Sequence, residues 1–134
     1  MSGVVELDAL LRSLTPRLQQ GEYVFCTVPG SLDAYTALEP VVTVKEDEGL
    51  TLLLPVSVAE REGFSFDGMF RKITLAVHSS LAAVGLTDAV SSRLASNGIP
   101  ANVVAGYYHD HIFVPTGKAQ DAVELLQLLA DSRD

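Results

Sequence analysis

The stretch Ile73-Thr-Leu-Ala-Val-His-Ser-Ser-Leu-Ala-Ala-Val-Gly-Leu-Thr-Asp-Ala-Val-Ser-Ser-Arg-Leu-Ala-Ser-Asn-Gly-Ile-Pro-Ala-Asn-Val-Val104 contains the clearest order of secondary structure in the chain. Apolar residues alternate with polar or small ones from Arg71 to His78, which predicts a β-strand. Thr87 is a suitable N-cap for a helix that extends to Ser96, and Asn97-Gly98 can end that helix in a left-handed turn. The stretch therefore predicts a strand, a loop containing a glycine, a helix and a second strand.

The segment after this stretch predicts a hairpin and a final helix. Residues 101–108 and 112–114 form apolar runs, and His109-Asp110 between them suits a turn. The final helix begins just after Pro115 and Thr116, because apolar side chains then recur at helical spacing. These side chains are Ala119, Ala122, Val123, Leu126, Leu129 and Ala130. The second half is thus predicted to have the order β-α-β-β-α.

The first half opens with leucines at helical spacing. They are Leu7, Leu10, Leu11, Leu14 and Leu18. We expect an amphipathic helix that ends at Gly21, with Pro16 dividing it into a helix and a final turn.

Three apolar runs then predict strands over residues 23–28, 41–45 and 50–54. The sequence Glu46-Asp47-Glu48-Gly49 predicts a hairpin turn whose acidic side chains form a solvated tip rather than a metal site. The segment from Pro29 to Pro40 is long for a compact domain, so we expect a short helix or a functional loop there. Residues 56–62 then predict a short helix that starts at Ser57.

One segment of the first half matches one of the second. Leu52-Leu-Leu-Pro-Val-Ser-Val-Ala59 and Ile112-Phe-Val-Pro-Thr-Gly-Lys-Ala119 are both apolar strands that end at a proline and precede a helix with an alanine. The match predicts an internal duplication, with an N-terminal unit over residues 1–65 and a C-terminal unit over residues 70–134. The strand at Arg71 to His78 could serve both halves.

Several strands are apolar at nearly every position, so we expect both faces of the sheet to be covered. Helices would cover one face, and another sheet or subunit the other. Cys26 lies inside an apolar strand and is interpreted as a small buried side chain.

Composition limits the classes of function. The 134 residues are 48% hydrophobic and 19% charged, with a formal net charge of −8. That charge disfavours nucleic acid and anionic membrane surfaces as partners. No apolar run approaches the roughly 20 residues that span a bilayer. The first residues have no basic or apolar signal region, so we expect a cytoplasmic protein.

The stretch from Ile73 to Val104 resembles an ACT domain of the type found in tandem in aspartokinase regulatory regions. Gly85, Leu94-Ala95, Gly98-Ile99 and Asn102 occupy the places of that family's loop glycine, helix end and second strand. The continuation to Pro115 is similar to small stand-alone bacterial ACT-like proteins. The resemblance implies an α+β, ferredoxin-like fold of two tandem βαββα units, with antiparallel sheets and helices on one face. It also implies a non-enzymatic regulatory module that forms a homo-oligomer, a dimer in the simplest case.

ACT modules commonly bind amino acids at the loop after the first strand, through backbone N–H groups there and at the start of the second strand. The resemblance places the binding site at residues His78, Ser79, Ser80, Val84, Gly85, Leu86, Thr87, Asn102 and Val103. Many such loops carry an acidic residue just after the first strand, whereas this one has no carboxylate until Asp88. The ligand could therefore be an amino acid or a different metabolite, and a purely structural role for Gly85 and Thr87 is a further alternative.

The cluster His109-Asp110-His111 raises a third hypothesis, a metal-dependent enzyme. Alternation along an extended chain would point Asp110 away from the two histidines, and Asp is a good turn former. We therefore predict no metal, no cofactor and no catalytic residue. The sequence leaves three candidate functions: a small-molecule sensor, a structural or protein-interaction module, and a metal-dependent enzyme.

Overall fold

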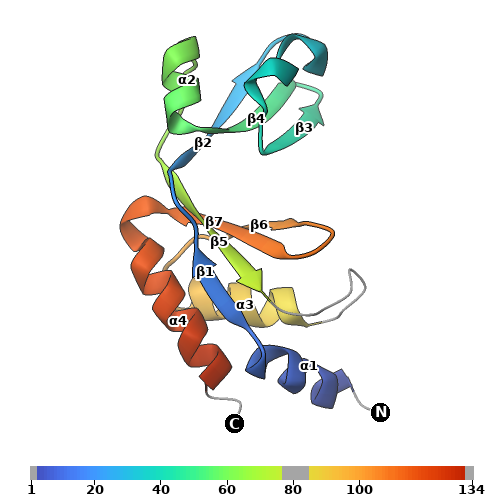
Figure 1. The fold of residues 1–134 in the computed structure, drawn as a ribbon, viewed down its shortest axis with the longest axis vertical. Coiled ribbons are helices and arrows are strands. Elements are labelled where there is room, and N and C mark those ends of the chain that lie inside the picture. The colour runs from blue at the N-terminus through green and yellow to red at the C-terminus, as the bar shows by residue number, and fades with distance from the viewer. Residues whose placement is uncertain (1–2, 77–84, 132–134) are drawn as a thin grey trace. The chain divides into compact units, whose positions relative to one another are not determined.

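The computed structural model describes residues 3–76 and 85–131, and of residues 3–6 the backbone alone (Figure 1). The chain forms two compact units. Unit 1 consists of Met1–Gln20 and Arg71–Asp134, and unit 2 consists of Gly21–Phe70. The first twenty residues thus group with the second half of the chain. No described helix is both long and apolar enough to cross a membrane.

Unit 1 contains a sheet with the strand order β1-β5-β7-β6. Its strands are β1 (Thr15–Leu18), β5 (Phe70–Ala76), β6 (Asn102–Ala105) and β7 (Asp110–Pro115). Its helices are α1 (Gly3–Arg12), α3 (Leu86–Ala95), α4 (Ala119–Asp131) and the 3₁₀ turn η3 (Thr116–Lys118). Strand β1 pairs antiparallel with β5, and β6 pairs antiparallel with β7.

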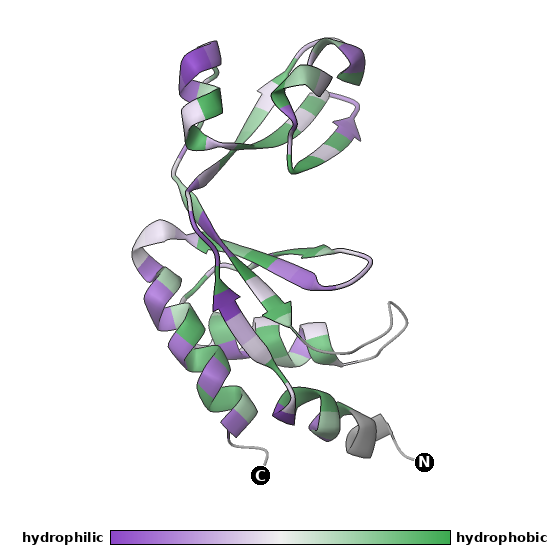
Figure 2. Ribbon diagram, viewed as in Figure 1, coloured by the Kyte–Doolittle hydropathy of each residue, from purple (hydrophilic) through white to green (hydrophobic). Residues whose placement is uncertain are grey.

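One face of this sheet packs against the helices. Ile73 and Leu75 of β5 join Ile112 and Val114 of β7 in one buried cluster with residues of α1, α3 and α4. Green and purple alternate along α4 in Figure 2, as expected for a helix with one apolar and one polar face. The helices-on-one-face, ferredoxin-like arrangement predicted from the sequence is confirmed in this unit.

Unit 2 contains three antiparallel strands in the order β3-β4-β2. Its elements are β2 (Tyr23–Val28), β3 (Val42–Glu46), β4 (Gly49–Pro55), α2 (Val56–Glu62) and the 3₁₀ turns η1 (Leu32–Ala34) and η2 (Thr36–Leu38). Alternate residues of β2 and β4 form its core together with Ala59 of α2. At the start of β2, Tyr23 pairs with Phe70, the first residue of β5.

The two segments that match in sequence adopt the same local structure. Pro55 ends β4 with φ −56° and ψ 141°, and Pro115 ends β7 with φ −53° and ψ 136°. The alanine four residues later is buried in each unit, as Ala59 and Ala119. A proline cannot continue the ladder and has a φ suited to the start of a helix, so each one switches the chain from strand to helix.

The predicted opening helix is wrong after Arg12, because residues 15–18 form strand β1. Pro16 disfavours the helical conformation at Thr15 and lacks the N–H that an internal helical turn requires. In the described residues β1 pairs with β5 alone, and such an edge strand tolerates a proline. The leucine spacing therefore holds for α1, while Leu14 and Leu18 reach the same core from an extended segment.

Two predicted boundaries also shift. Gly85, and not Thr87, is the N-cap of α3. Its φ of +97° is a left-handed backbone conformation, which glycine adopts readily because it has no Cβ. The β6–β7 turn lies before Asp110, where the Gly106 N–H donates to the His109 carbonyl at 2.9 Å. Asp110 is then the first residue of β7.

The packing of α1 can be used to test whether the N-terminal segment belongs to the core of unit 1. Leu11 is fully buried in its core, so Leu11→Ala should lower the free energy of unfolding by about 2–5 kcal/mol. Leu128→Ala is the control, because Leu128 is 57% exposed and its truncation should cost below about 1 kcal/mol. Urea denaturation measures both. Equal losses would show that the N-terminal segment is not part of the core.

Candidate functional site

The predicted binding loop of unit 1 is described only in part. His78, Ser79, Ser80 and Val84 lie outside the described residues. Gly85 has a left-handed backbone, and a Cβ there would lie 3.1 Å from Cδ2 of Leu7. Leu86 is buried in the core of unit 1, so of its groups only the backbone could serve a ligand. The Thr87 side chain is exposed in the first turn of α3.

The other two predicted site residues, Asn102 and Val103, open strand β6. The Asn102 side-chain amide donates to the Phe113 carbonyl at 3.2 Å, so it reinforces the β6–β7 hairpin. Helix α3, ten residues long, separates them from Gly85, which corresponds to roughly 15 Å along the helix axis. Gly85 thus precedes α3, and Asn102 and Val103 follow it.

Unit 2 has a loop at the same position in its element order, between its first strand and the next helical segment. Strand β2 ends at Val28, and Pro29-Gly30-Ser31 leads into η1. Gly30 has φ +90°, close to the +97° of Gly85. The Tyr35 hydroxyl donates to the Pro29 carbonyl, which ties the loop to the following turn.

This loop forms one wall of a pocket of about 650 Å³, here named the hairpin pocket. The other wall is the β3–β4 hairpin, which reaches the loop because Val28 pairs with Leu50 at the start of β4. Pocket volumes of 300–1,000 Å³ are typical of small-molecule sites. Its lining residues are Pro29, Gly30, Ser31, Leu32, Asp33, Thr43, Lys45, Glu46, Asp47, Glu48, Gly49 and Leu50.

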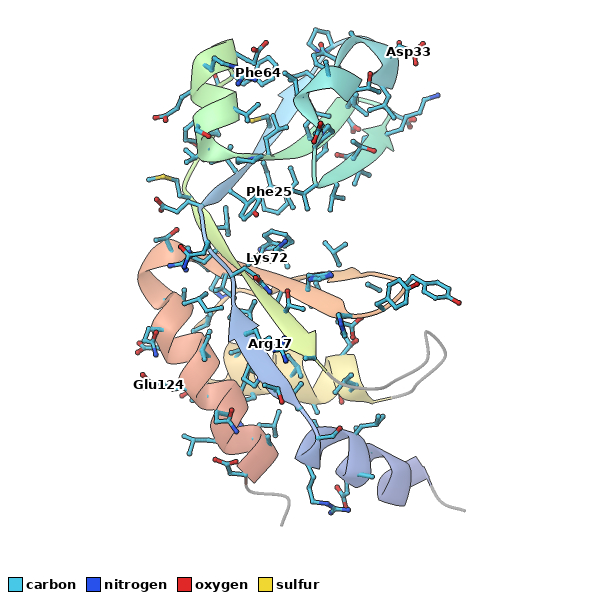
Figure 3. All side chains as sticks on the ribbon, in the orientation of Figure 1. Arg17, Phe25, Asp33, Phe64, Lys72 and Glu124 are labelled. Atoms are coloured by element: carbon cyan, nitrogen blue, oxygen red, sulfur yellow. The ribbon has the colours of Figure 1, made fainter. Side chains whose placement is uncertain are left out.

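The hairpin pocket carries charges of both signs. Lys45 is its one cationic lining residue, and Asp33 and the acidic hairpin residues 46–48 line it too. Figure 3 labels Asp33 beside the helical turns that follow β2. Glu46 accepts a hydrogen bond from the Thr51 hydroxyl, and buried Leu50 supplies an apolar surface. Such a pocket can pair with both the carboxylate and the ammonium group of a zwitterion.

Sequence reasoning identified the two walls of the hairpin pocket separately. The segment from Pro29 to Pro40 is the predicted functional loop, and Glu46–Gly49 is the predicted solvated hairpin tip. Their proximity follows from the antiparallel pairing of β2 with β4, which puts the end of β2 beside the start of β4. No local sequence signal gives that pairing.

Comparison with known proteins identifies the family. Models of the ACT domain match residues 2–71 and residues 68–127. The chain belongs to the ACT domain family. The tandem ACT resemblance seen in the sequence is therefore confirmed. No curated protein matches the sequence.

Solved structures agree with this assignment. A Vibrio cholerae protein of unknown function, described as a possible transport protein, is 52% identical, with a TM-score of 0.89. The match covers 96% of this chain and 99% of that one. An Agrobacterium tumefaciens protein is 18% identical over 87% of this chain and 89% of its own, with a TM-score of 0.73. The aspartate kinase regulatory subunit of Thermus thermophilus is 9% identical over 85% of this chain and 95% of its own, with a TM-score of 0.61. The matches at 18% and 9% identity show a similar fold and nothing more.

The histidine cluster of the β6–β7 hairpin is held by the sheet of unit 1. The ring nitrogen Nδ1 of His111 lies 3.0 Å from the Thr74 hydroxyl oxygen, which accepts a hydrogen bond from the Gln19 amide at 3.1 Å. His111 thus bonds to β5 through Thr74, and Gly106 packs against its ring. Among the described residues, no group of three or more His, Cys, Asp or Glu side chains could hold a metal ion.

The surroundings of His111 favour its neutral form. Burial lowers the pKa of His111, and the positive charges of Lys72 and His109 lower it further, against the opposing effect of Asp110. A lowered pKa in the folded state means that the unfolded chain takes up this proton more readily. The contribution of His111 to the free energy of unfolding is therefore present at pH values above 6.5, the ordinary pKa of histidine. It is lost as the pH falls below 6.5 toward the lowered pKa of the folded state.

This sign gives a testable pH dependence. The free energy of unfolding should fall between about pH 7.5 and about pH 5, and His111→Gln should reduce that fall because a glutamine does not titrate. His109→Gln is the matched control. It removes an exposed histidine two residues away and leaves burial, the largest cause of the lowered pKa of His111, in place, so most of the fall should remain. Urea denaturation at both pH values measures the effect. If the free energy of unfolding of His111→Gln fell with pH as much as that of the parent, His111 would not be the group responsible.

Proposed function

We propose that the protein is a regulatory module that senses a small metabolite, that its ligand is an α-amino acid, and that the hairpin pocket is the binding site. The family assignment supports the regulatory role, because ACT domains are typically regulatory modules that bind amino acids and are not catalytic. The relative from Thermus thermophilus is itself a regulatory subunit of aspartate kinase. A cytoplasmic location fits this role and forms part of the proposal.

The observation that carries the choice of ligand is the charge arrangement of the hairpin pocket. Lys45 can pair with an α-carboxylate, and Asp33 with the acidic hairpin residues can pair with an α-ammonium group. The loop before α3 holds no carboxylate until Asp88. The unit 2 pocket therefore supplies the acidic partner that the unit 1 loop lacks.

The predicted residues of unit 1 are proposed as a second, equivalent site. His78, Ser79, Ser80, Val84, Gly85, Leu86 and Thr87 would form its loop wall. Asn102 and Val103 would complete it from a second copy of the chain, since the length of α3 separates them from Gly85 within one chain. Ligand binding at this second site would then depend on the assembly state.

A thermal-shift panel of the twenty α-amino acids tests the ligand class. A ligand that binds the folded state at 100 times its Kd stabilises it by about 2.7 kcal/mol, so the melting temperature should rise for at least one member. Lys45→Gln and Asp33→Asn should each weaken that ligand by about tenfold or more, because each removes one charge-assisted hydrogen bond.

Two matched variants control for the loss of charge alone. Arg61→Gln removes an exposed cation of unit 2, and Glu60→Gln removes an exposed carboxylate, both in α2 and outside the hairpin pocket. Neither should change the affinity. The proposed function fails if no amino acid stabilises the protein, and the proposed site fails if Lys45→Gln and Asp33→Asn bind as tightly as the parent.

We also propose that the chain forms a dimer through strand β6. In the described residues β6 has a neighbour on one side only, and residues 102–108 carry no charge. Strand β3, an edge strand of unit 2, carries Lys45 and Glu46, and charged side chains on an edge strand discourage further pairing. Tyr107 and Tyr108 lie in the turn that follows β6, with exposed fractions of 79% each, and tyrosines are enriched at protein interfaces.

Charge placed on each edge strand tests the dimer. Val104→Lys would bring two lysines together across a twofold axis, so the dimer should dissociate to monomers in light scattering coupled to size exclusion. Val44→Lys is the matched control on β3, where Val44 is 46% exposed, and should stay dimeric. A monomeric parent protein, or a dimer that survives Val104→Lys, would contradict the proposal.

A further inference from the structure

Unit 2 contains a second pocket that shares no residue with the hairpin pocket. It has a volume of about 450 Å³ and is here named the phenylalanine pocket. Its lining residues are Phe25, Thr27, Ser65, Phe66, Asp67 and Phe70. All six belong to unit 2, so the pocket is formed within that unit.

The pocket lies on the sheet face turned away from the core of unit 2. Val24 and Cys26 of β2 are in that core, so Phe25 and Thr27 between and after them point to the opposite face. Figure 3 shows Phe25 on the other side of the β2 ribbon from Phe64, which packs against the core. Phe25 and Thr27 therefore lie on the face opposite to the core that α2 covers.

The aromatic walls are fixed in position. The rings of Phe25 and Phe70 meet edge to face, with centroids 5.2 Å apart and an interplanar angle of 89°. Pairing of Tyr23 with Phe70 holds the backbone of Phe70 against β2. Phe66 packs against the core cluster. Rings held in this way form a preorganised apolar surface that a ligand need not order on binding.

The charge of the phenylalanine pocket has a single sign. Asp67 is its only charged lining residue, with the Thr27 and Ser65 hydroxyls as its other polar side chains. A cation beside an aromatic ring is attracted by the negative face of the ring, and a carboxylate at the same place adds a direct ionic partner. The net charge of −8 on the chain acts in the same direction.

We propose that the phenylalanine pocket binds an organic amine, specifically a protonated amine with an apolar or aromatic body and no carboxylate. The body fills the space between Phe25, Phe66 and Phe70, and the ammonium group pairs with Asp67. An α-amino acid is a poor fit, because its carboxylate would lie near Asp67 with no lysine or arginine in the pocket lining to pair with it. This specificity is opposite to that proposed for the hairpin pocket, which contains Lys45.

Isothermal titration calorimetry with 2-phenylethylamine as the probe tests the proposal on the full chain. Two matched probes separate the contributions: 2-phenylethanol lacks the charge, and phenylalanine adds a carboxylate to the same body. We expect the amine to bind at least about tenfold more tightly than the alcohol, since a charge-assisted hydrogen bond is lost in the alcohol. Competition between the amine and phenylalanine should be absent, even if phenylalanine binds in the hairpin pocket.

Variants locate the binding. Asp67→Asn is isosteric at an exposed residue and should weaken the amine by about tenfold or more. Phe25→Leu keeps an apolar side chain and should weaken it by about two- to fivefold through loss of the cation–π contact. Asp33→Asn, in the hairpin pocket, is the control and should leave amine binding unchanged.

The outcomes separate the two sites. Amine binding that disappears in Asp67→Asn and persists in Asp33→Asn supports the proposal, whether or not any amino acid binds. The proposal is overturned if the amine fails to bind, if Asp67→Asn binds it as tightly as the parent, or if phenylalanine displaces it. Failure of the amine together with a response to amino acids that depends on Lys45 would leave the proposed function intact.

Discussion

The pairing of β1 with β5 joins parts of the chain that lie more than fifty residues apart, and the sheet of unit 1 depends on it. Leu18 pairs with Ile73, the Gln19 N–H donates to the Lys72 carbonyl at 2.8 Å, and the Arg71 guanidinium donates to the Gln19 carbonyl at 2.8 Å. Closing so long a loop costs conformational entropy, although the cost grows slowly with loop length. Burial of Leu11 and Leu14 in the common core offsets it. The first residues of the chain are therefore part of the unit formed by its last ones.

The two ACT repeats share one structural transition and differ in the segment that follows their first strand. In both repeats a proline ends the strand and a buried alanine anchors the next helix. After the first strand, unit 1 has the ten-residue helix α3, whereas unit 2 has two 3₁₀ turns of three residues each. These turns bring Asp33 to the hairpin pocket together with Lys45. A shared fold thus carries different loops in its two copies, as expected when loops vary on a common scaffold.

The sequence predicted elements well where pattern and local chemistry agreed. Strand β2 has the predicted bounds, helix α2 begins one residue before the predicted Ser57, and the Glu46–Gly49 turn joins β3 and β4 as expected. Prediction failed at Thr15–Leu18, where leucine spacing favoured a helix and Pro16 together with the pairing to β5 imposed a strand. The spacing of apolar residues does not by itself distinguish a helix from an extended segment here, because an extended segment can place Leu14 and Leu18 in the same core.

The sequence by itself determined the family, the order of most elements and the internal duplication, because these follow from local spacing, turn residues and a matched pair of segments. Only the tertiary structure decided which residues meet. Strand pairing put the loop after Val28 beside the β3–β4 hairpin. Phe25 and Phe70, forty-five positions apart in the chain, became neighbours through the pairing of Tyr23 with Phe70. Register between distant strands depends on the sum of many weak side-chain and backbone contacts, and no single segment of the sequence contains that sum.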